Sequence, residues 1–150
     1  MPGPAPRSLT EPELSKILED GRFGTLASVR STGHPHLSTV LYHWSSAERL
    51  LRVSTTQDRL KPRHYRADPH AALHVGRDDF TFAVAEGEAE VTPPSTSPGD
   101  AVGSELLAVA RQFVADGAEE EFYAEMVAER RVVIRIKVTR LYGTALDGAV

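Results

Sequence analysis

The sequence predicts an α+β protein built on a predominantly antiparallel β-barrel of six to seven strands with peripheral helices. Two observations favour this fold class. Short runs of β-branched and alternating apolar residues, bounded by turn residues such as Gly, Pro, Asp and Ser, recur through most of the chain. Helical periodicity is confined to the N-terminus, one short central segment and a late region, so strands and helices do not alternate as they do in a doubly wound parallel sheet.

The first expected element is a helix from about Glu11 to Asp20. Thr10 is a suitable N-cap, Pro12 fits the first turn, and Glu13 stands three residues after the cap. The apolar residues of the segment form one stripe, Leu14, Ile17 and Leu18. Gly21 is expected to end the helix in a left-handed conformation.

The expected strands follow from alternation and from β-branched runs. They are 23–29, 36–43, 50–54, 71–75, 80–91 and 132–138, the last followed by 140–143. The turn Ser31-Thr32-Gly33-His34 predicts that the first two of these strands pair as a hairpin. Closure into a barrel would leave no sheet edge exposed, and we expect the apolar face of Ile134, Ile136 and Val138 to be covered by a second copy of the chain.

The remaining helices are assigned from proline positions and 3.6-residue periodicity. Pro62 is tolerated in a first turn, which predicts a short helix at about 61–67 that Asp68-Pro69 closes. The three prolines of 92–99 predict a loop. Apolar residues then recur at helical spacing within 102–113 and again within 119–129, so two helices are expected there.

Length and composition indicate one globular domain. The chain has 150 residues, 41% of them hydrophobic, and no cysteine, which excludes disulfides, thiolate metal sites and a cysteine nucleophile. We expect a flexible N-terminus at 1–9, one cofactor-binding domain at 10–145 and a C-terminal tail at 146–150. The sequence has neither a signal-peptide pattern nor an apolar run of about 20 residues, so a cytoplasmic protein without membrane contact is expected.

The most unusual stretch is a basic segment, residues 49–66, in an acidic chain. It carries a formal charge of +5, although the whole chain is at −4. Its cations are Arg49, Arg52, Arg59, Lys61, Arg63 and Arg66, and its only acid is Asp58. A short positive segment at the end of a strand suits a small polyanion, and a chain with a pI near 5.9 is a poor partner for nucleic acid. A solvated surface helix with scattered charge is the alternative.

Several motifs, in this order, resemble the pyridoxamine 5′-phosphate oxidase-like split barrels, the FMN-binding split-barrel fold. They are Gly24-Thr25-Leu26-Ala27-Ser28-Val29, Gly33-His34-Pro35-His36-Leu37-Ser38, Ser54-Thr55-Thr56 and the run from Arg59 to Pro69. Tyr42-His43, the segment 82–89 and the ending from Arg131 to Gly143 are most similar to the actinobacterial branch that binds coenzyme F420. The resemblance spans roughly residues 10–145.

The resemblance implies a homodimer that holds its cofactor in a groove at the subunit interface. The strand-end hydroxyls and a basic pair would bind the cofactor phosphate: Ser54, Thr55, Arg59 and Lys61. Charge-assisted hydrogen bonds from Arg and Lys suit this task. Arg63 and Arg66 would attract the carboxylate-rich tail that distinguishes F420 from FMN.

The resemblance also points to side chains near the cofactor ring. His36 and Thr39 stand where relatives place polar groups toward the ring, but strand alternation puts them on opposite faces unless the strand bulges or the groove is open to both. Phe80 and Phe82 share an expected strand face and would reach the ring from the partner subunit. They are equally well explained as core aromatics.

The function that these features favour is an F420-dependent oxidoreductase that passes hydride to an unsaturated or quinone-like small molecule. No catalytic side chain is assigned, because the cofactor carries the chemistry. The six histidines are scattered without grouped acids, so no metal site is expected. One alternative is an FMN-binding oxidase, although the residues after Gly143 lack the Arg-Leu-x-x-Pro-type block of the vitamin B6 enzymes. The other is a carrier that holds F420, FMN or haem without turnover.

Overall fold

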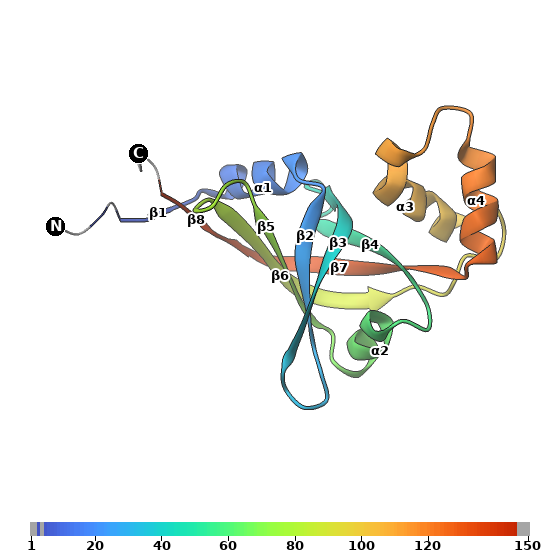
Figure 1. The fold of residues 1–150 in the computed structure, drawn as a ribbon, viewed down its shortest axis with the longest axis horizontal. Helices are drawn as coiled ribbons and strands as arrows, with labels where there is room; N and C mark the ends of the chain where they lie inside the picture. Colours follow the sequence, from blue (N-terminus) through green and yellow to red (C-terminus); the bar gives the residue numbers. More distant parts are fainter. Residues whose placement is uncertain (1–2, 4, 147–150) are drawn as a thin grey trace.

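The computed structural model describes residues 3 and 5–146, and Figure 1 shows their fold. Its strands are β1 (Arg7–Ser8), β2 (Phe23–Val29), β3 (Pro35–Ser45), β4 (Leu50–Thr56), β5 (His70–Gly76), β6 (Phe82–Val91), β7 (Arg131–Tyr142) and β8 (Thr144–Ala145). Its helices are α1 (Glu11–Asp20), α2 (Leu60–Ala67), α3 (Ala101–Ala110), the short 3-10 helix η1 (Arg111–Phe113) and α4 (Glu119–Ala128).

Six of the strands close into a barrel in the order β2-β3-β4-β7-β6-β5, and every neighbouring pair is antiparallel. β1 and β8 form a separate two-stranded sheet beside it. The α+β class and the antiparallel barrel are therefore confirmed. The two runs expected at 132–138 and 140–143 are one strand, because a bulge opposite Glu86 and Gly87 leaves Thr139 without a register partner and lets pairing continue.

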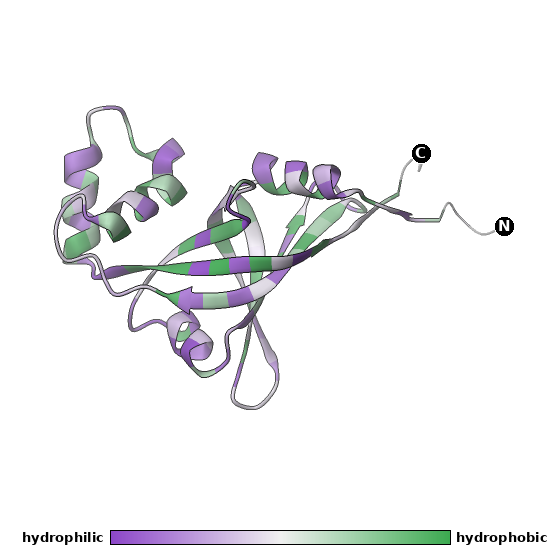
Figure 2. Cartoon of the chain, turned by 180° about the vertical axis from the view of Figure 1, so that it is seen from behind, coloured by the Kyte–Doolittle hydropathy of each residue, from purple (hydrophilic) through white to green (hydrophobic). Residues whose placement is uncertain are grey.

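The hydrophobic core fills the barrel, and two helices complete it. Hydrophobic and hydrophilic residues alternate along β7, as Figure 2 shows, so each strand directs one face inward. α1 lies over the barrel and α2 lies below it in Figure 1. α1 contributes Leu14, Ile17 and Leu18 to the core, and α2 contributes Tyr65. Burying such apolar side chains is the main source of stability, about 1.5–3 kcal/mol for each.

The expectation that Ile134, Ile136 and Val138 form an outer face for a second copy is wrong. These side chains are at most 7% exposed in a single chain and belong to the barrel core. The β-branched run at this position is the inward face of β7, between β4 and β6. It therefore offers no surface to a partner.

Two further expectations about local structure are corrected. Gly21 does follow α1, but its φ is −79°, so it is extended and not left-handed. Glycine is required there for space, because a Cβ would lie 2.4 Å from the Tyr42 hydroxyl oxygen. β6 begins at Phe82, not at Phe80, because the Asp78 carboxylate accepts the backbone N–H groups of Phe80 and Thr81 and closes a turn before the strand.

Between β6 and β7 the chain leaves the barrel and forms a helical hairpin, α3 and α4, which stands at one end of the barrel in Figure 1. The Asp100 carboxylate fixes its start. That carboxylate accepts the backbone N–H groups of Gly103, Thr96 and Ser97 and the hydroxyl of Ser95. Burial opposes ionisation, yet these hydrogen bonds hold the pKa of Asp100 below its ordinary value.

The expected N-terminal segment and C-terminal tail lie partly outside the described residues, which leave out 1–2, 4 and 147–150. Within the described part, Arg7 and Ser8 pair with Ala145 and Thr144, so the two ends of the chain meet in one small sheet. No helix among residues 3 and 5–146 has the length and apolar character needed to span a bilayer.

Candidate functional site

A cavity of about 370 Å³ opens where β3, β4, the start of α2 and the α3–α4 hairpin meet. One end of it is polar and is lined by Thr39, Ser54, Thr55, Arg59, Lys61 and Arg131. The other end is apolar and is lined by Leu41, Leu106, Val109, Ala110, Phe122 and Met126, beside Val40. Such a cavity matches a ligand with an anionic end and a flat apolar end.

The polar end is produced by the alternation of β3 and β4. Val53 and Thr55 are buried on the inner face of β4, and Ser54 between them stands on the outer face. The chain then turns through residues 57–58, and Arg59 is the N-cap residue of α2 with extended backbone. Lys61 follows in the first turn, so two cations and a hydroxyl reach one end of the cavity.

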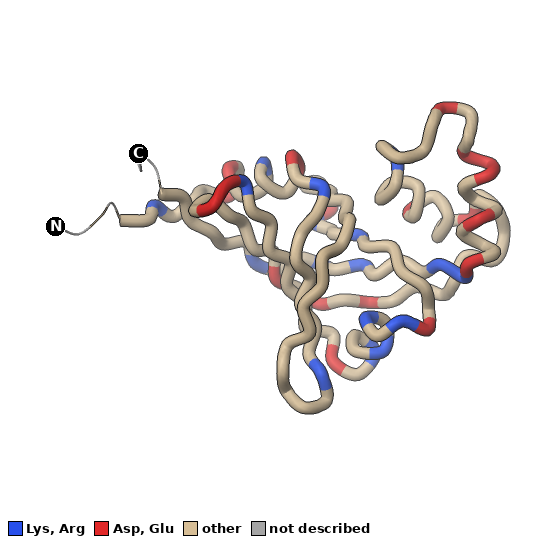
Figure 3. Tube along the Cα trace, viewed as in Figure 1, with Lys and Arg blue, Asp and Glu red and all other residues tan. Residues whose placement is uncertain are grey.

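The structure divides the basic segment into paired and unpaired cations. Arg49 pairs with Glu11, and Arg52 pairs with Glu105 and Glu48. By contrast, Arg59, Lys61, Arg63 and Arg66 form no ion pair with any residue of 3 and 5–146. Figure 3 shows that Lys and Arg positions gather along α2 and the turn before it.

The electrostatics of Lys61 fit an anion site. Burial, followed by the neighbouring charge of Arg59, lowers the pKa of the Lys61 ammonium below its ordinary value. An ammonium group with partial burial and a like-charged neighbour gains most from a bound phosphate, which supplies the missing negative charge. The residues present therefore fit the phosphate group that the sequence predicts here.

The apolar end depends on how the α3–α4 hairpin is attached to the barrel. Leu106, Met126 and Val133 form a second small core between the two helices and the outer face of β7. Beside it, the Glu105 carboxylate accepts hydrogen bonds from Arg52 on β4 and Arg135 on β7. α3 is therefore held against the barrel by an apolar cluster and by an ion-pair network.

Five of the predicted site residues meet in this cavity, Thr39, Ser54, Thr55, Arg59 and Lys61. The other four are placed elsewhere in the single chain. His36 faces the opposite side of β3 from Thr39, where its ring meets that of His64 with centroids 5.2 Å apart. The alternation argument for these two residues is thus confirmed, and β3 does not bulge between them.

The remaining three lie on the molecular surface. Arg63 is exposed on α2, two residues beyond Lys61 and outside the cavity lining. Phe80 is 59% exposed in the turn before β6. Phe82 stacks on His74 of β5, with ring centroids 5.2 Å apart, so neither aromatic belongs to the core of one chain.

Sequence reasoning missed the contributions of β7 and the helical hairpin. Arg131 reaches the polar end and pairs with Glu129, while Phe122 and Met126 form the apolar wall. Helical periodicity predicted that Phe122 and Met126 share a buried face, but nothing in the pattern says which surface that face covers. The order of strands in the barrel decides this, and it brings the hairpin beside β4.

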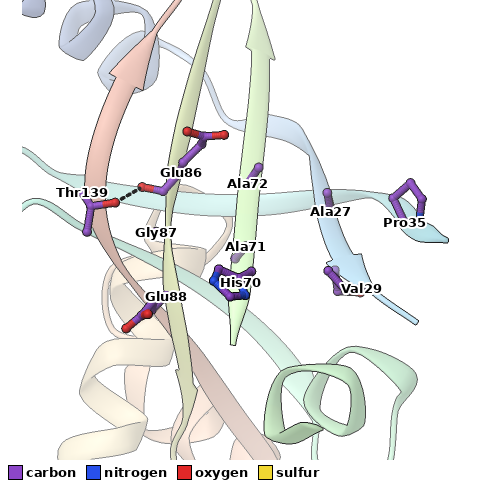
Figure 4. Close-up of a pocket in the computed structure, with 11 residues that line it drawn as sticks. Ala27, Val29, Pro35, His70, Ala71, Ala72, Glu86, Gly87, Glu88 and Thr139 are labelled. Carbon is purple, nitrogen blue, oxygen red and sulfur yellow. Dashed lines mark hydrogen bonds between the residues drawn. The ribbon is translucent and has the colours of Figure 1, made fainter. Parts of the chain in front are cut away.

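A second hollow, of about 460 Å³, lies on the outer face of β2, β5 and β6 and is shown in Figure 4. Small and acidic residues line it: Ala27, Val29, Ala72, Glu86, Gly87 and Glu88, together with Ser28, Pro35, His70, Ala71 and Thr139. No lysine or arginine is among them, so the hollow does not suit a phosphate. Across the described part of the chain, no three His, Asp or Glu side chains are grouped to hold a metal ion.

The chain matches one known protein family over most of its length. Residues 10–145 match the family described as pyridoxamine 5′-phosphate oxidase. The solved structure of an F420 reductase is 25% identical, with a TM-score of 0.65, and the match covers 85% of this chain and 94% of that one.

Two further structures show the same fold. A conserved hypothetical protein from Mycobacterium tuberculosis is 21% identical with a TM-score of 0.74, and the match covers 98% of this chain and 91% of that one. A FAD-binding protein from Mesorhizobium loti is 22% identical with a TM-score of 0.64, covering 93% of this chain and 96% of that one.

Proposed function

The chain belongs to the pyridoxamine 5′-phosphate oxidase family, and from this premise we propose that it is an F420-dependent oxidoreductase. The cavity that joins two unpaired cations to an apolar wall carries the proposal. The reduced deazaflavin supplies a hydride, and an unsaturated or quinone-like organic molecule accepts it.

The side chains of the cavity divide the work of binding. Arg59 and Lys61 hold the phosphate of the cofactor with charge-assisted hydrogen bonds, and the Ser54 hydroxyl adds a neutral one. Leu106, Phe122 and Met126 pack against the ring and exclude water from it. The chain needs no acid or base of its own for this reaction, because hydride transfer is the chemistry of the cofactor.

F420 is favoured over FMN by two observations. One similar protein of known structure, 25% identical to this chain, is an F420 reductase. On this chain, Arg63 and Arg66 continue the unpaired positive charge of α2 beyond the cavity, where the carboxylates of an F420 tail would lie. FMN is the second candidate, since it offers the same phosphate to Arg59 and Lys61 and a similar protein binds FAD.

The proposal includes a homodimer with the cofactor between the subunits. The cavity is an open hollow on a single chain, so a second copy would be needed to enclose the ring. Phe80, at 59% exposed, and Phe82 are the aromatic side chains that the partner would bring to it. Size-exclusion chromatography with light scattering reports the oligomeric state directly.

The test is a fluorescence titration of cofactor-free protein with F420 and with FMN at two salt concentrations. We expect micromolar binding of F420, much weaker binding of FMN, and lower affinity at high salt because the contacts are ionic. Lys61→Ala and Arg59→Ala should each raise Kd about tenfold or more, the loss of one charge-assisted hydrogen bond. Lys137→Ala is the matched control, because it removes an exposed cation that does not line the cavity.

Unchanged affinity in both cavity variants would remove the phosphate assignment, and tighter binding of FMN than of F420 would overturn the cofactor assignment. Turnover separates an enzyme from a carrier. Reduced F420 mixed with menadione should be oxidised faster with the protein than without it. Equal rates, with F420 bound, would leave the carrier as the function.

A further inference from the structure

A separate hollow of about 650 Å³ lies between the end of α1, β3 and the end of α3. Its lining includes Glu19, Asp20, Arg22, His43, Trp44 and Arg111. Val109 of α3 also lines the cavity of about 370 Å³ described above, here called the cofactor cavity, so the two spaces adjoin at this side chain. We refer to this space as the α1–α3 hollow.

The outer face of β3 runs through both spaces. Thr39 and Leu41 line the cofactor cavity, and His43 lines the α1–α3 hollow. These residues alternate with the inward-facing Val40 and Tyr42, so they share one face. At a rise of about 3.3 Å per residue, His43 follows Thr39 by about 13 Å along the strand. A ligand ring seated at Leu41 therefore has His43 beyond it.

His43 carries a polar atom that the fold leaves without a partner. Its Nδ1 atom is buried and has no hydrogen bond. Burial lowers the pKa of the ring, the charge of Arg52 on the paired strand lowers it further, and Glu48 opposes them. The imidazole is therefore neutral at neutral pH and carries a single N–H.

The position of that proton follows from the burial of Nδ1. A buried N–H without an acceptor is rarer in proteins than a buried acceptor without a donor. The favoured tautomer thus has a bare Nδ1 and a protonated Nε2, an assignment made from hydrogen bonding. Only Nδ1 of this ring is both buried and unpartnered, so Nε2–H is the donor left for a ligand in the hollow.

The charges around the hollow are balanced. Glu19 and Asp20 come from the end of α1, with Asp20 paired to Lys16 and Arg77. Arg22 and Arg111 line the same hollow and carry the opposite, positive charge. A space whose charges balance, and in which His43 adds a neutral donor, favours an uncharged molecule that carries an acceptor oxygen.

We propose that the α1–α3 hollow binds the organic substrate, a neutral quinone or enone, and that Nε2–H of His43 donates a hydrogen bond to its carbonyl oxygen. This inference rests on the proposed function. The hydride adds to a substrate carbon with its electron pair, the carbonyl π electrons move to the oxygen, and a proton from water completes the reduced product. A bound cofactor would supply this hydride and would thereby be oxidised by two electrons. His43 keeps its proton and stabilises the charge that develops on oxygen, as a neutral donor does in an oxyanion site.

Trp44, the only tryptophan of the chain, lines the same hollow and reports its occupancy. Titration of cofactor-free protein with menadione should quench its fluorescence along a saturating curve. His43→Phe should raise the menadione Kd about fivefold or more, the loss of one hydrogen bond. His43→Gln, whose amide N–H reaches a similar place, should restore most of the affinity. His34→Ala, an exposed histidine in the β2–β3 turn, is the matched control and should match the wild type.

The controls separate this inference from the proposed function. Lys61→Ala should weaken F420 binding and leave the menadione curve unchanged, while His43→Phe should do the reverse. In turnover, His43→Phe should lower kcat/KM for the quinone with F420 affinity intact. Linear quenching without saturation, or equal menadione Kd in His43→Phe and the wild type, would overturn the substrate site. A saturating, His43-dependent curve in a protein that does not bind F420 would instead overturn the proposed cofactor.

Discussion

Replacing Glu105 by alanine should loosen the wall of the cavity between β3, β4, α2 and the α3–α4 hairpin, because this carboxylate joins α3 to two strands of the barrel. It accepts the Nε–H of Arg52 at 2.8 Å and the Nε–H of Arg135 at 2.8 Å, and a second N–H of Arg135 also donates to it. Its side chain is 15% exposed, and that of Arg52 is 13% exposed. Removing Glu105 therefore leaves both guanidinium groups with fewer partners, and that of Arg52 has little access to water.

The expected loss of folding stability depends on the ion pairs that Arg52 and Arg135 retain in the variant. Breaking a buried ion pair from one side costs about 3–5 kcal/mol. Arg52 keeps Glu48 and Arg135 keeps Glu90, both at 3.2 Å, but these acids are more than half exposed and such pairs contribute about 0–1 kcal/mol. Because Arg135 also retains some solvent contact, we expect a loss of about 2–4 kcal/mol. For a chain of this length that lowers Tm by roughly 4–16 °C.

The assay is thermal unfolding followed by circular dichroism, with urea unfolding as a second measure. Glu125→Ala is the matched control, since that acid is exposed on α4 and pairs with no cation in the described part of the chain. It should change stability by less than about 0.5 kcal/mol. If Glu105→Ala unfolds at the same temperature as Glu125→Ala, the network does not hold α3 and the reasoning fails.

The stability lost in Glu105→Ala should also depend on pH. Hydrogen bonds from Arg135, and from Arg52 against the opposing effect of burial, hold the pKa of Glu105 below its ordinary value of 4.5. A carboxyl with a lowered folded pKa contributes its full stability above the unfolded pKa and loses it as the pH falls through the folded pKa. The difference in stability between the wild type and Glu105→Ala should therefore be constant at neutral pH and shrink below about pH 4.5. A difference that is independent of pH would contradict this.

Two more predictions follow from single positions. Gly87→Ala should destabilise the barrel by at least about 2 kcal/mol, because its Cβ would meet the Lys137 carbonyl oxygen at 2.0 Å; Gly76→Ala, with nothing closer than 3.8 Å, is the control in the same urea assay. F420 affinity should fall as the pH rises through the lowered pKa of free Lys61, because a bound phosphate raises that pKa and binding then requires proton uptake. Lys61→Arg should abolish this pH dependence, and its persistence would show that another group is responsible.

Most of the fold was predictable because its signals are local. The Thr10–Glu13 capping box and α1 lie where the motif predicts them, and the alternation of β2 and β4 is visible in a few residues. The predictions that were wrong concern positions where tertiary contacts determine the local structure. Gly21 looks like a helix cap but is required by the proximity of Tyr42, and no local pattern distinguishes the two causes. The inward face of β7 was mistaken for an outer face because a β-branched run does not reveal on which side the core lies.

The grouping of residues in the cavity was predictable as far as they lie on one continuous segment. Ser54, Arg59 and Lys61 follow one another across a strand end, and their proximity needs no knowledge of topology. Phe122 and Met126 reach the same cavity from residues 119–128, and only the strand order of the closed barrel brings them there. The predicted roles of His36, Phe80 and Phe82 toward a cofactor remain predictions. In a single chain they point to other surfaces.

The net charge of the basic segment overstates its attraction for anions. Arg49 and Arg52 are neutralised by Glu11 and by Glu105 with Glu48, and Arg52 thereby serves to hold α3 in place. The unpaired charge is concentrated at α2, beside one end of the outer face of β3, whereas the hollow at the other end has balanced charge around His43. The outer face of β3 therefore favours an anionic ligand at the end beside α2 and a neutral ligand at the end beside His43. Under the proposed function, such a division would orient the cofactor and the substrate head to tail before any reaction takes place, without a catalytic side chain.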